Sequence, residues 1–249
     1  MKVCIVQHDI VWQNPTENIR RMDELLNQAP KADMYVLAEM WATGFGDKPQ
    51  EDPIEAMLWM IRKSRELGVA IVGSLPVKLN NYWANRLYFA QPDFTLLHYD
   101  KRHLFSPGGE KDSFAAGQER VVVRWGGVRW LLQVCYDLRF PVFSRNQDDY
   151  DVALYVANWT EKRRRVWDTL LRARALENQC YVVGVNRVGS DPQCDYDGGS
   201  VIVDAYGRTV ASCQDGCEGM AVAELDLEQL AAFRKKFPVL NDRDHYTLL

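Results

Sequence analysis

The sequence predicts an α/β fold built from packed layers of strands and helices, as a single domain over residues 1–249. Apolar runs of strand length are mixed with segments whose apolar residues recur at helical spacing. Several predicted strands follow one another directly, which indicates hairpins as well as strand–helix–strand units. No linker rich in proline, glycine or serine divides the chain, and 249 residues with 47% apolar side chains can bury a large core.

The first part of the chain contains a clear helix start. Asn14 suits the N-cap position, Pro15 the first helical position and Glu17 a capping box. A second helix is expected over residues 53–67, because Gly68 follows it as a C-cap. Strands are expected at Lys2–Gln7, Met34–Leu37, Val69–Gly73, Asn85–Ala90, Phe94–Tyr99 and Val121–Arg124.

The second part of the chain continues this mixture. A short helix is expected over Phe140–Asn146, a longer one spans the apolar positions from Val166 to Ala175, and a last one covers Leu227–Phe237. A tight turn leads into a strand at Thr209–Ser212, which is a hairpin signal. The remaining strands are expected at Val128–Val134, Val152–Ala157, Tyr181–Val185, Ser200–Asp204 and Met220–Leu225.

Composition argues against several classes of protein. The net charge of −4 is small and there is no basic stripe, so no nucleic-acid partner is expected. The densest basic cluster, Glu161–Arg165, is interpreted as the solvated first turn of a helix. No apolar run reaches about 18 residues and Met1–Ile10 is too polar for a signal peptide, so we expect no membrane segment and a cytoplasmic protein. The cysteine and histidine spacings predict free thiols and no metal site.

Three residues of complementary chemistry follow apolar runs: Glu39, Lys101 and Cys135. Ligand sites in α/β sheets collect beyond the carboxyl ends of strands, so we expect these side chains to meet. A thiol needs a base or a positive charge nearby to act as a nucleophile. Glu39 can take the proton of Cys135, and Lys101 can stabilise the thiolate and an oxyanion. The Tyr136 backbone N–H is a natural second oxyanion donor, in a geometry similar to a nucleophile elbow.

The segments around these residues resemble the signature blocks of the nitrilase, or carbon–nitrogen hydrolase, superfamily. The blocks are Ala38–Met40, Tyr99–Phe105 and Val134–Pro141, and further similarity lies in Ala157–Trp159, Arg172–Gln179 and Gly184–Gly189. The similarity therefore covers essentially the whole chain. It implies a four-layer α/β/β/α sandwich with a catalytic Glu39, Lys101 and Cys135 triad that uses no metal or organic cofactor.

The same resemblance implies a second glutamate that supports the lysine and the substrate. Glu110 matches this position best, and Glu119 is the competing candidate. Family members usually form homodimers or larger homo-oligomers. The sequence leaves open whether Asn241–Leu249 packs on the body of the protein or on a second subunit.

Two pairs of charged residues beside the blocks are given structural roles. Asp137 and Arg139 are expected to pair locally and fix the turn at the nucleophile, and Arg102 and His103 are expected to support the lysine block. The five other cysteines are expected to be inert.

Within the family, the blocks most resemble the omega-amidase branch. Its members release ammonia from the terminal amide of 2-oxo dicarboxylic monoamides, such as 2-oxoglutaramate and 2-oxosuccinamate, and the mechanism implied here passes through a thioester on Cys135. An anionic substrate needs a cation, and the candidates are Arg139, Arg163 and Arg187. Trp41, Phe45 and Trp159 are either pocket walls or ordinary core residues. Relatives often carry Ala-Asn-Trp-Pro where this chain has Thr160, a change expected to reshape the loop that lines the pocket.

Other functions are weighed against this one. Another amidase of the family would act on a carbamoyl amine or an aliphatic amide, and a nitrile substrate fits the blocks less well. An acyltransferase would let an amine intercept the thioester, but no membrane segment or accessory domain favours it. A non-catalytic scaffold on the same fold is opposed by the intact Glu39, Lys101 and Cys135.

Overall fold

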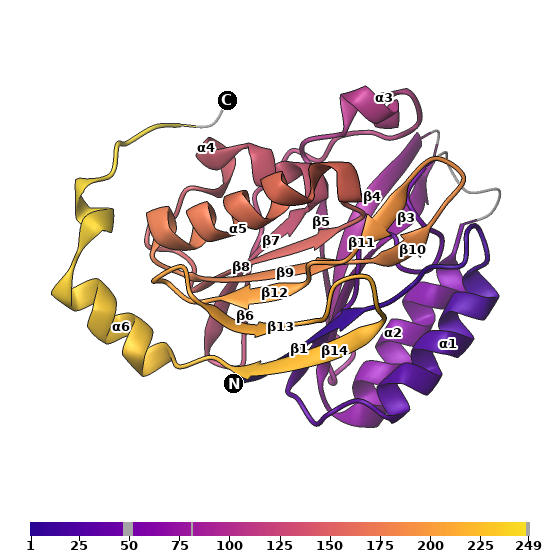
Figure 1. The fold of residues 1–249 in the computed structure, drawn as a ribbon, viewed down its shortest axis with the longest axis horizontal. Helices are drawn as coiled ribbons and strands as arrows, with labels where there is room; N and C mark the ends of the chain where they lie inside the picture. The colour runs from indigo at the N-terminus through magenta and orange to yellow at the C-terminus, as the bar shows by residue number, and fades with distance from the viewer. Residues whose placement is uncertain (47–51, 81, 248–249) are drawn as a thin grey trace.

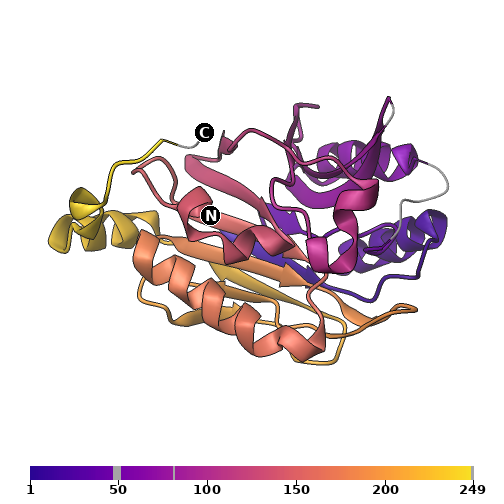
Figure 2. The same ribbon diagram turned by 90° about the horizontal axis from the view of Figure 1, so that it is seen from above.

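The computed structural model describes residues 1–46, 52–80 and 82–247. Within these residues, two six-stranded sheets lie face to face and helices cover the outer side of each sheet (Figure 1, Figure 2). The predicted four-layer α/β/β/α arrangement is confirmed. No helix in the described part of the chain is both long and apolar enough to cross a membrane.

The first sheet has the strand order β14-β1-β2-β3-β4-β5. The three strands β1, β2 and β3 run parallel, and the remaining pairings are antiparallel. As a result β2 and β5 point the same way and their carboxyl ends lie at the same edge of the sheet. The strands are β1 (Lys2–Gln7), β2 (Met34–Val36), β3 (Ala70–Leu79), β4 (Tyr82–Ala90), β5 (Leu96–Asp100) and β14 (Gly219–Glu224).

The second sheet has the strand order β13-β12-β9-β8-β7-β6, with β7, β8 and β9 parallel. Its strands are β6 (Val122–Trp125), β7 (Val128–Val134), β8 (Val152–Ala157), β9 (Tyr181–Asn186), β12 (Val201–Val203) and β13 (Thr209–Ser212). A separate two-stranded hairpin consists of β10 (Val188–Ser190) and β11 (Asp195–Asp197). The sequence did not predict this hairpin.

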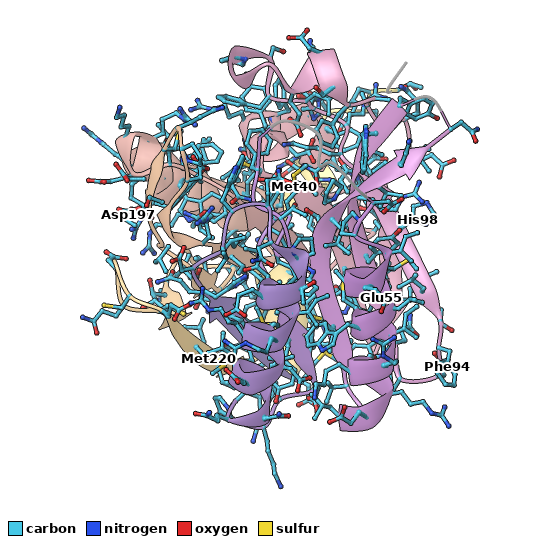
Figure 3. All side chains as sticks on the ribbon, turned by 90° about the vertical axis from the view of Figure 1, so that its right-hand side faces the viewer. Met40, Glu55, Phe94, His98, Asp197 and Met220 are labelled. Atoms are coloured by element: carbon cyan, nitrogen blue, oxygen red, sulfur yellow. The ribbon has the colours of Figure 1, made fainter. Side chains whose placement is uncertain are left out.

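Helices α1 and α2 lie side by side over the first sheet, and Figure 3 views the molecule from their side, with Glu55 on α2. Helix α5 covers the second sheet. The α-helices are α1 (Pro15–Asn27), α2 (Ile54–Leu67), α3 (Glu110–Ser113), α4 (Pro141–Ser144), α5 (Arg164–Asn178) and α6 (Leu227–Lys236). Short 3-10 turns are η1 (Ser106–Gly108), η2 (Cys135–Arg139), η3 (Glu161–Arg163) and η4 (Val239–Asp242).

The Asn14 N-cap of α1 and the end of α2 follow the sequence signals, but the capping box predicted for Glu17 was wrong, because the Glu17 carboxylate accepts from Arg20 instead. The Asn14 side chain accepts a hydrogen bond from the Glu17 N–H at 3.1 Å, as an N-cap residue does. Gly68 ends α2 with φ of 68°, a left-handed conformation that costs glycine little.

Alternation along the strands divides the core into two layers. Val3 and Ile5 face the second sheet, whereas Cys4 and Val6 face α1 and α2. This is the period of two that a strand imposes on its side chains. Because β1 is buried on both faces, its sequence is a continuous apolar run rather than an alternating one.

Strand β3 continues to Leu79, well beyond the expected end at Gly73. Pro76 lies inside it, opposite Asn85 of β4. The pairing of β3 with β2 stops at Val72, so the N–H that proline lacks is not needed on that side.

Two further predicted boundaries were wrong. The strand expected from Phe94 begins only at Leu96, because Phe94 has φ of 69° and occupies a turn. The helix expected over Phe140–Asn146 covers only α4, because the Asn146 side chain instead donates to the carbonyls of Tyr150 and Asn178, both at 3.0 Å.

The described part of the C-terminal tail returns to the body of the protein. The Tyr246 hydroxyl donates a hydrogen bond to the carbonyl of Val142 in α4. Residues 248–249 of this segment lie outside the described residues.

Candidate active site

The three predicted catalytic residues meet at the junction of the two sheets. Glu39 lies shortly after β2, Lys101 directly follows β5, and Cys135 directly follows β7. Glu39 and Lys101 have no exposed surface, and Cys135 is 9% exposed. In Figure 3, Met40, the neighbour of Glu39, lies between His98 of β5 and Asp197 of β11.

Lys101 is held between two carboxylates. Its Nζ is 2.9 Å from Glu39 Oε1 and 2.9 Å from Glu110 Oε2. The structure therefore brings Glu110, the better-matching candidate, to the lysine, whereas Glu119 lies exposed beside a separate hollow. Asn85 joins the two acids, because its Nδ2 donates to Glu39 Oε1 at 2.7 Å and to Glu110 Oε1 at 3.2 Å.

These contacts determine the charge of the lysine. Burial acts to lower the pKa of the Lys101 ammonium, but the charges of Glu110 and Glu39 outweigh it and raise the pKa. Burial raises the pKa of Glu110, and Glu39 adds to this effect while Lys101 opposes it. Lys101 is therefore a fixed, buried positive charge near neutral pH.

Cys135 has the backbone strain expected of a nucleophile at a sharp turn. Its φ is 44°, in the left-handed region that a residue with a Cβ rarely adopts. Burial raises the pKa of its thiol well above the usual value, and the charge of Glu39 adds to this while Lys101 opposes it. The resting group is therefore a neutral thiol.

Asp137 connects the lysine loop to the cysteine turn. Its Oδ2 accepts from the Val134 N–H at 2.9 Å and from the Tyr99 hydroxyl at 2.8 Å. Its Oδ1 accepts from the His103 N–H at 3.0 Å and lies 2.7 Å from His103 Nδ1. The structural role expected of His103 agrees with these contacts.

The expected pairing of Asp137 with Arg139 was wrong. The Asp137 oxygens face the groups just described, and the Arg139 guanidinium instead lies 5.2 Å from the centre of the Trp159 ring. Arg139 is thereby turned toward the cavity rather than toward the elbow.

Asn158 orients the base, a role that the sequence did not assign. Its N–H donates to Glu39 Oε2 at 2.8 Å, and its Nδ2 donates to the Glu39 carbonyl at 2.5 Å. The Cys135 Sγ lies 3.9 Å from the Asn158 carbonyl oxygen. Asn158 lies inside Ala157–Trp159, one of the segments that resemble the family, and Asn85 is a polar residue within the apolar strand β4. Both features could have indicated a functional role from the sequence.

A cavity of about 290 Å³ opens onto Cys135. Phe45 and Trp159 line the cavity, so of the two interpretations given above they are pocket walls rather than ordinary core residues. Arg139 and Arg163 line it as well. The Arg163 guanidinium lies 5.0 Å from the centre of the Phe105 ring. Neither arginine has a carboxylate partner among the described residues, so both charges are available to a ligand.

Two predicted pocket residues lie outside this cavity. Trp41 is fully buried beside Trp59, 5.1 Å between ring centres, in the layer between the first sheet and α2. Arg187 is also fully buried, and its Nη2 is 2.9 Å from Asp9 Oδ1. Its guanidinium lies 4.5 Å from the centre of the Tyr196 ring, and Tyr196 lines the cavity while Arg187 does not, so Arg187 supports the wall.

The unpredicted β10–β11 hairpin forms one wall of the cavity through Asp191, Gln193, Cys194 and Tyr196. Asp191 fixes its turn, because Oδ1 accepts from the N–H groups of Gln193 and Cys194, each at 2.8 Å. Its Oδ2 accepts from the Tyr196 hydroxyl at 2.6 Å.

The basic cluster Glu161–Arg165 is only partly solvated. Arg163 faces the cavity, and Arg164 pairs with Asp168, Asp197 and Asp215 at 2.9, 3.1 and 2.8 Å. Arg164, Asp168 and Asp215 line a larger and more open hollow of about 570 Å³ along α5. Its other arginine, Arg172, donates to the Gly207 carbonyl and the Thr209 hydroxyl. We assign the chemistry to the smaller cavity because it opens onto Cys135.

Within the residues that the structure describes, no three or more histidine, cysteine, aspartate or glutamate side chains are grouped so as to hold a metal ion. The functional groups at the site are a thiol, two carboxylates and an ammonium, and this set suits nucleophilic attack on a carbonyl carbon.

Comparisons with known proteins agree with the fold. The carbon–nitrogen hydrolase family matches residues 2–235. The chain is 46% identical to the omega-amidase YafV of Yersinia enterocolitica, over 100% of this chain and 99% of that protein. It is 35% identical to the 2-oxoglutaramate amidase of Bacillus subtilis, over 96% of each. The crystal structure of a CN-hydrolase superfamily protein from Xanthomonas campestris, with an arsenic adduct in its active site, superposes with a TM-score of 0.93 at 38% identity and covers 100% of this chain and 98% of that one.

The chain therefore belongs to the carbon–nitrogen hydrolase family, and it is a hydrolase that acts on the carbon–nitrogen bonds of amides. Within that family it is similar to omega-amidases along its full length.

Proposed function

We propose that this chain is an omega-amidase that hydrolyses the terminal amide of a small 2-oxo dicarboxylic monoamide, 2-oxoglutaramate or 2-oxosuccinamate. The observation that carries the proposal is the pairing, in one cavity, of a buried thiol with two arginines that have no carboxylate partner among the described residues. The thiol suits the amide end of such a substrate and the arginines suit its carboxylate end. The activities for which the two amidase relatives are named support the same substrate class.

The first half of the reaction forms a thioester. Glu39 takes the thiol proton as Cys135 Sγ attacks the amide carbon, and the carbonyl electron pair moves onto oxygen. Lys101 Nζ and the Tyr136 N–H stabilise that oxyanion. The carbon–nitrogen bond then breaks, Glu39 gives its proton to the departing nitrogen, and ammonia leaves.

The second half consumes one water molecule. Glu39 takes a proton from the water as the water oxygen attacks the thioester carbon. The carbon–sulfur bond breaks, the proton returns to Cys135, and the 2-oxo acid is released. Asn85, Asn158 and Lys101 hold the Glu39 carboxylate in position through both halves.

The raised pKa of the Cys135 thiol supports this sequence of proton transfers. A thiol that stays protonated near neutral pH needs a base in the step itself, because its own ionisation supplies little thiolate. Glu110 serves as a positioning residue, since it pairs with Lys101 in addition to Glu39.

The test is ammonia release from 2-oxoglutaramate by the wild-type protein, by Cys135→Ala and by Cys217→Ala. Cys217 is exposed and lies outside the cavity, so it is a matched control for loss of a thiol. We expect release by the wild type and the control and none by Cys135→Ala. Release that survives in Cys135→Ala would exclude the thioester mechanism.

The alternatives have their own outcomes in the same experiment. If the wild type is inactive on 2-oxoglutaramate but active on an aliphatic or carbamoyl amide, the substrate proposed here is wrong and the family chemistry stands. If an added primary amine is acylated faster than water attacks, the chain is an acyltransferase.

The assembly of the protein stays a prediction. We propose a homodimer or larger homo-oligomer, as family members usually form, and light scattering on the purified protein would measure it directly. A monomeric mass would exclude this.

A further inference from the structure

Thr160 carries a buried hydroxyl that has no partner among the residues that the structure describes. The residue is 5% exposed, and its Oγ1 is buried without a hydrogen bond in the described part of the chain. Thr160 occupies the N-cap position of η3, where a threonine oxygen commonly accepts a backbone N–H, yet its side chain makes no capping bond. Only its carbonyl serves the turn, by accepting from the Arg163 N–H at 3.0 Å.

An unpartnered buried hydroxyl is unfavourable unless something else satisfies it. Thr160 lines the cavity at Cys135, on the same short segment as Trp159 and Arg163. The helix does not use the hydroxyl, and the residue borders a space of ligand size. The missing partner is therefore most simply supplied by the ligand.

The lining of the cavity contains several hydrogen-bond donors and also a buried acceptor. The Thr160 hydroxyl and the guanidiniums of Arg139 and Arg163 can all donate hydrogen bonds. Asn158, whose backbone carbonyl lies 3.9 Å from Cys135 Sγ, also has a buried side-chain acceptor, Oδ1, without a partner among the described residues. A matching ligand has both a donor group and acceptor oxygens, as an amide with a 2-oxo acid group does.

We propose that Thr160 is a specificity-determining residue whose hydroxyl donates a hydrogen bond to the 2-oxo acid end of the substrate, beside the charge of Arg163. This inference rests on the proposed omega-amidase function and names a residue that selects its substrate. A residue without a side-chain donor at this position, such as proline, could not make this bond. Thr160 makes no bond to the reacting atoms, so its contribution is to binding and orientation.

The test compares Thr160→Val, which removes the hydroxyl but keeps the branched shape, with Thr160→Ser, which keeps the hydroxyl. Thr169→Val is the matched control, because Thr169 is exposed on α5 and its hydroxyl bonds to the Arg165 carbonyl. Two quantities are measured for each protein. One is kcat/KM for ammonia release from 2-oxoglutaramate and from butyramide, and the other is the Kd of 2-oxoglutarate by calorimetry.

A hydrogen bond to a charged acceptor is worth enough that its loss lowers affinity about 10- to 100-fold. We expect Thr160→Val to weaken 2-oxoglutarate binding by that factor and to lower kcat/KM for 2-oxoglutaramate, mainly through KM, more than for butyramide. Thr160→Ser should recover most of the loss, and Thr169→Val should match the wild type.

The outcomes separate this inference from the proposed function. If the wild type turns over 2-oxoglutaramate but Thr160→Val binds 2-oxoglutarate as tightly as the wild type, the role of Thr160 is overturned and the omega-amidase function stands. Equal losses on both amides, or no recovery in Thr160→Ser, would mean that the residue only shapes the loop. If the wild type neither binds 2-oxoglutarate nor hydrolyses 2-oxoglutaramate, both proposals fail.

Discussion

Replacement of His8 should flatten the dependence of stability on pH between about 4 and 6.5. His8 follows β1, is 3% exposed, and its Nε2 has no partner in the described part of the chain. Burial lowers the pKa of His8 from 6.5 to about 4, with the nearby charge of Arg187 also lowering it and the Val6 carbonyl opposing the change.

The sign and size follow from proton binding. In the unfolded chain His8 takes up a proton below its ordinary pKa of about 6.5, whereas in the folded protein it does so only below about 4. The free energy of unfolding therefore decreases as the pH falls through this window. A difference of about 2.5 in pKa, at about 1.4 kcal/mol for each unit, corresponds to about 3 kcal/mol.

Urea unfolding of the wild type and of His8→Asn at several pH values measures the effect. The replacement changes the stability at neutral pH as well, so the informative quantity is the slope of unfolding free energy against pH. His245→Asn is the control, because it removes an exposed histidine near the end of the chain. If His8→Asn loses as much stability from pH 6.5 to 4.5 as the wild type does, His8 is not buried as a neutral ring and the reasoning fails.

Three further predictions concern the active site. Glu110→Gln should lower kcat about 100-fold with little change in KM, because Lys101 loses the partner that positions it; a larger effect on KM in steady-state assays would contradict this. Asp137→Asn should lower the free energy of unfolding by about 3 kcal/mol, since an amide cannot accept from all the donors that meet there, and a change below about 1 kcal/mol in urea unfolding would refute the role. Iodoacetamide should label the exposed Cys217 first, and the sites of labelling can be followed by mass spectrometry. Labelling of Cys135 should need Glu39 and should be slowed by 2-oxoglutarate. Labelling of Cys135 that survives Glu39→Gln would argue against Glu39 as the base.

The layers and the meeting of the candidate catalytic residues were predictable because their signals are local. The β1 strand, the cap at Asn14 and the turn at Gly68 depend on few neighbouring residues, and each agrees with its predicted structure. Glu39, Lys101 and Cys135 stand at strand ends, where topology alone brings them together. Their mutual contacts supported the family resemblance independently.

The parts that were missed depend on contacts between distant segments. The β10–β11 hairpin is short and polar, and the Asp191 side chain, rather than an apolar face, holds its turn. Strand β3 passes Pro76 only because β2 has already ended beside it. Arg187 was a candidate substrate-binding residue because nothing in the neighbouring sequence reveals that its guanidinium pairs with Asp9.

The neutral state of the Cys135 thiol also bears on how long the protein survives in the presence of oxidants. Peroxide attacks thiolates and spares thiols, so a buried cysteine whose pKa is raised is oxidised slowly while the cavity is empty. A nucleophile activated in advance by a low pKa would lack this resistance. In the mechanism proposed above, Glu39 removes the proton only as the bond to carbon forms, so the reactive sulfur exists for no longer than the chemical step requires.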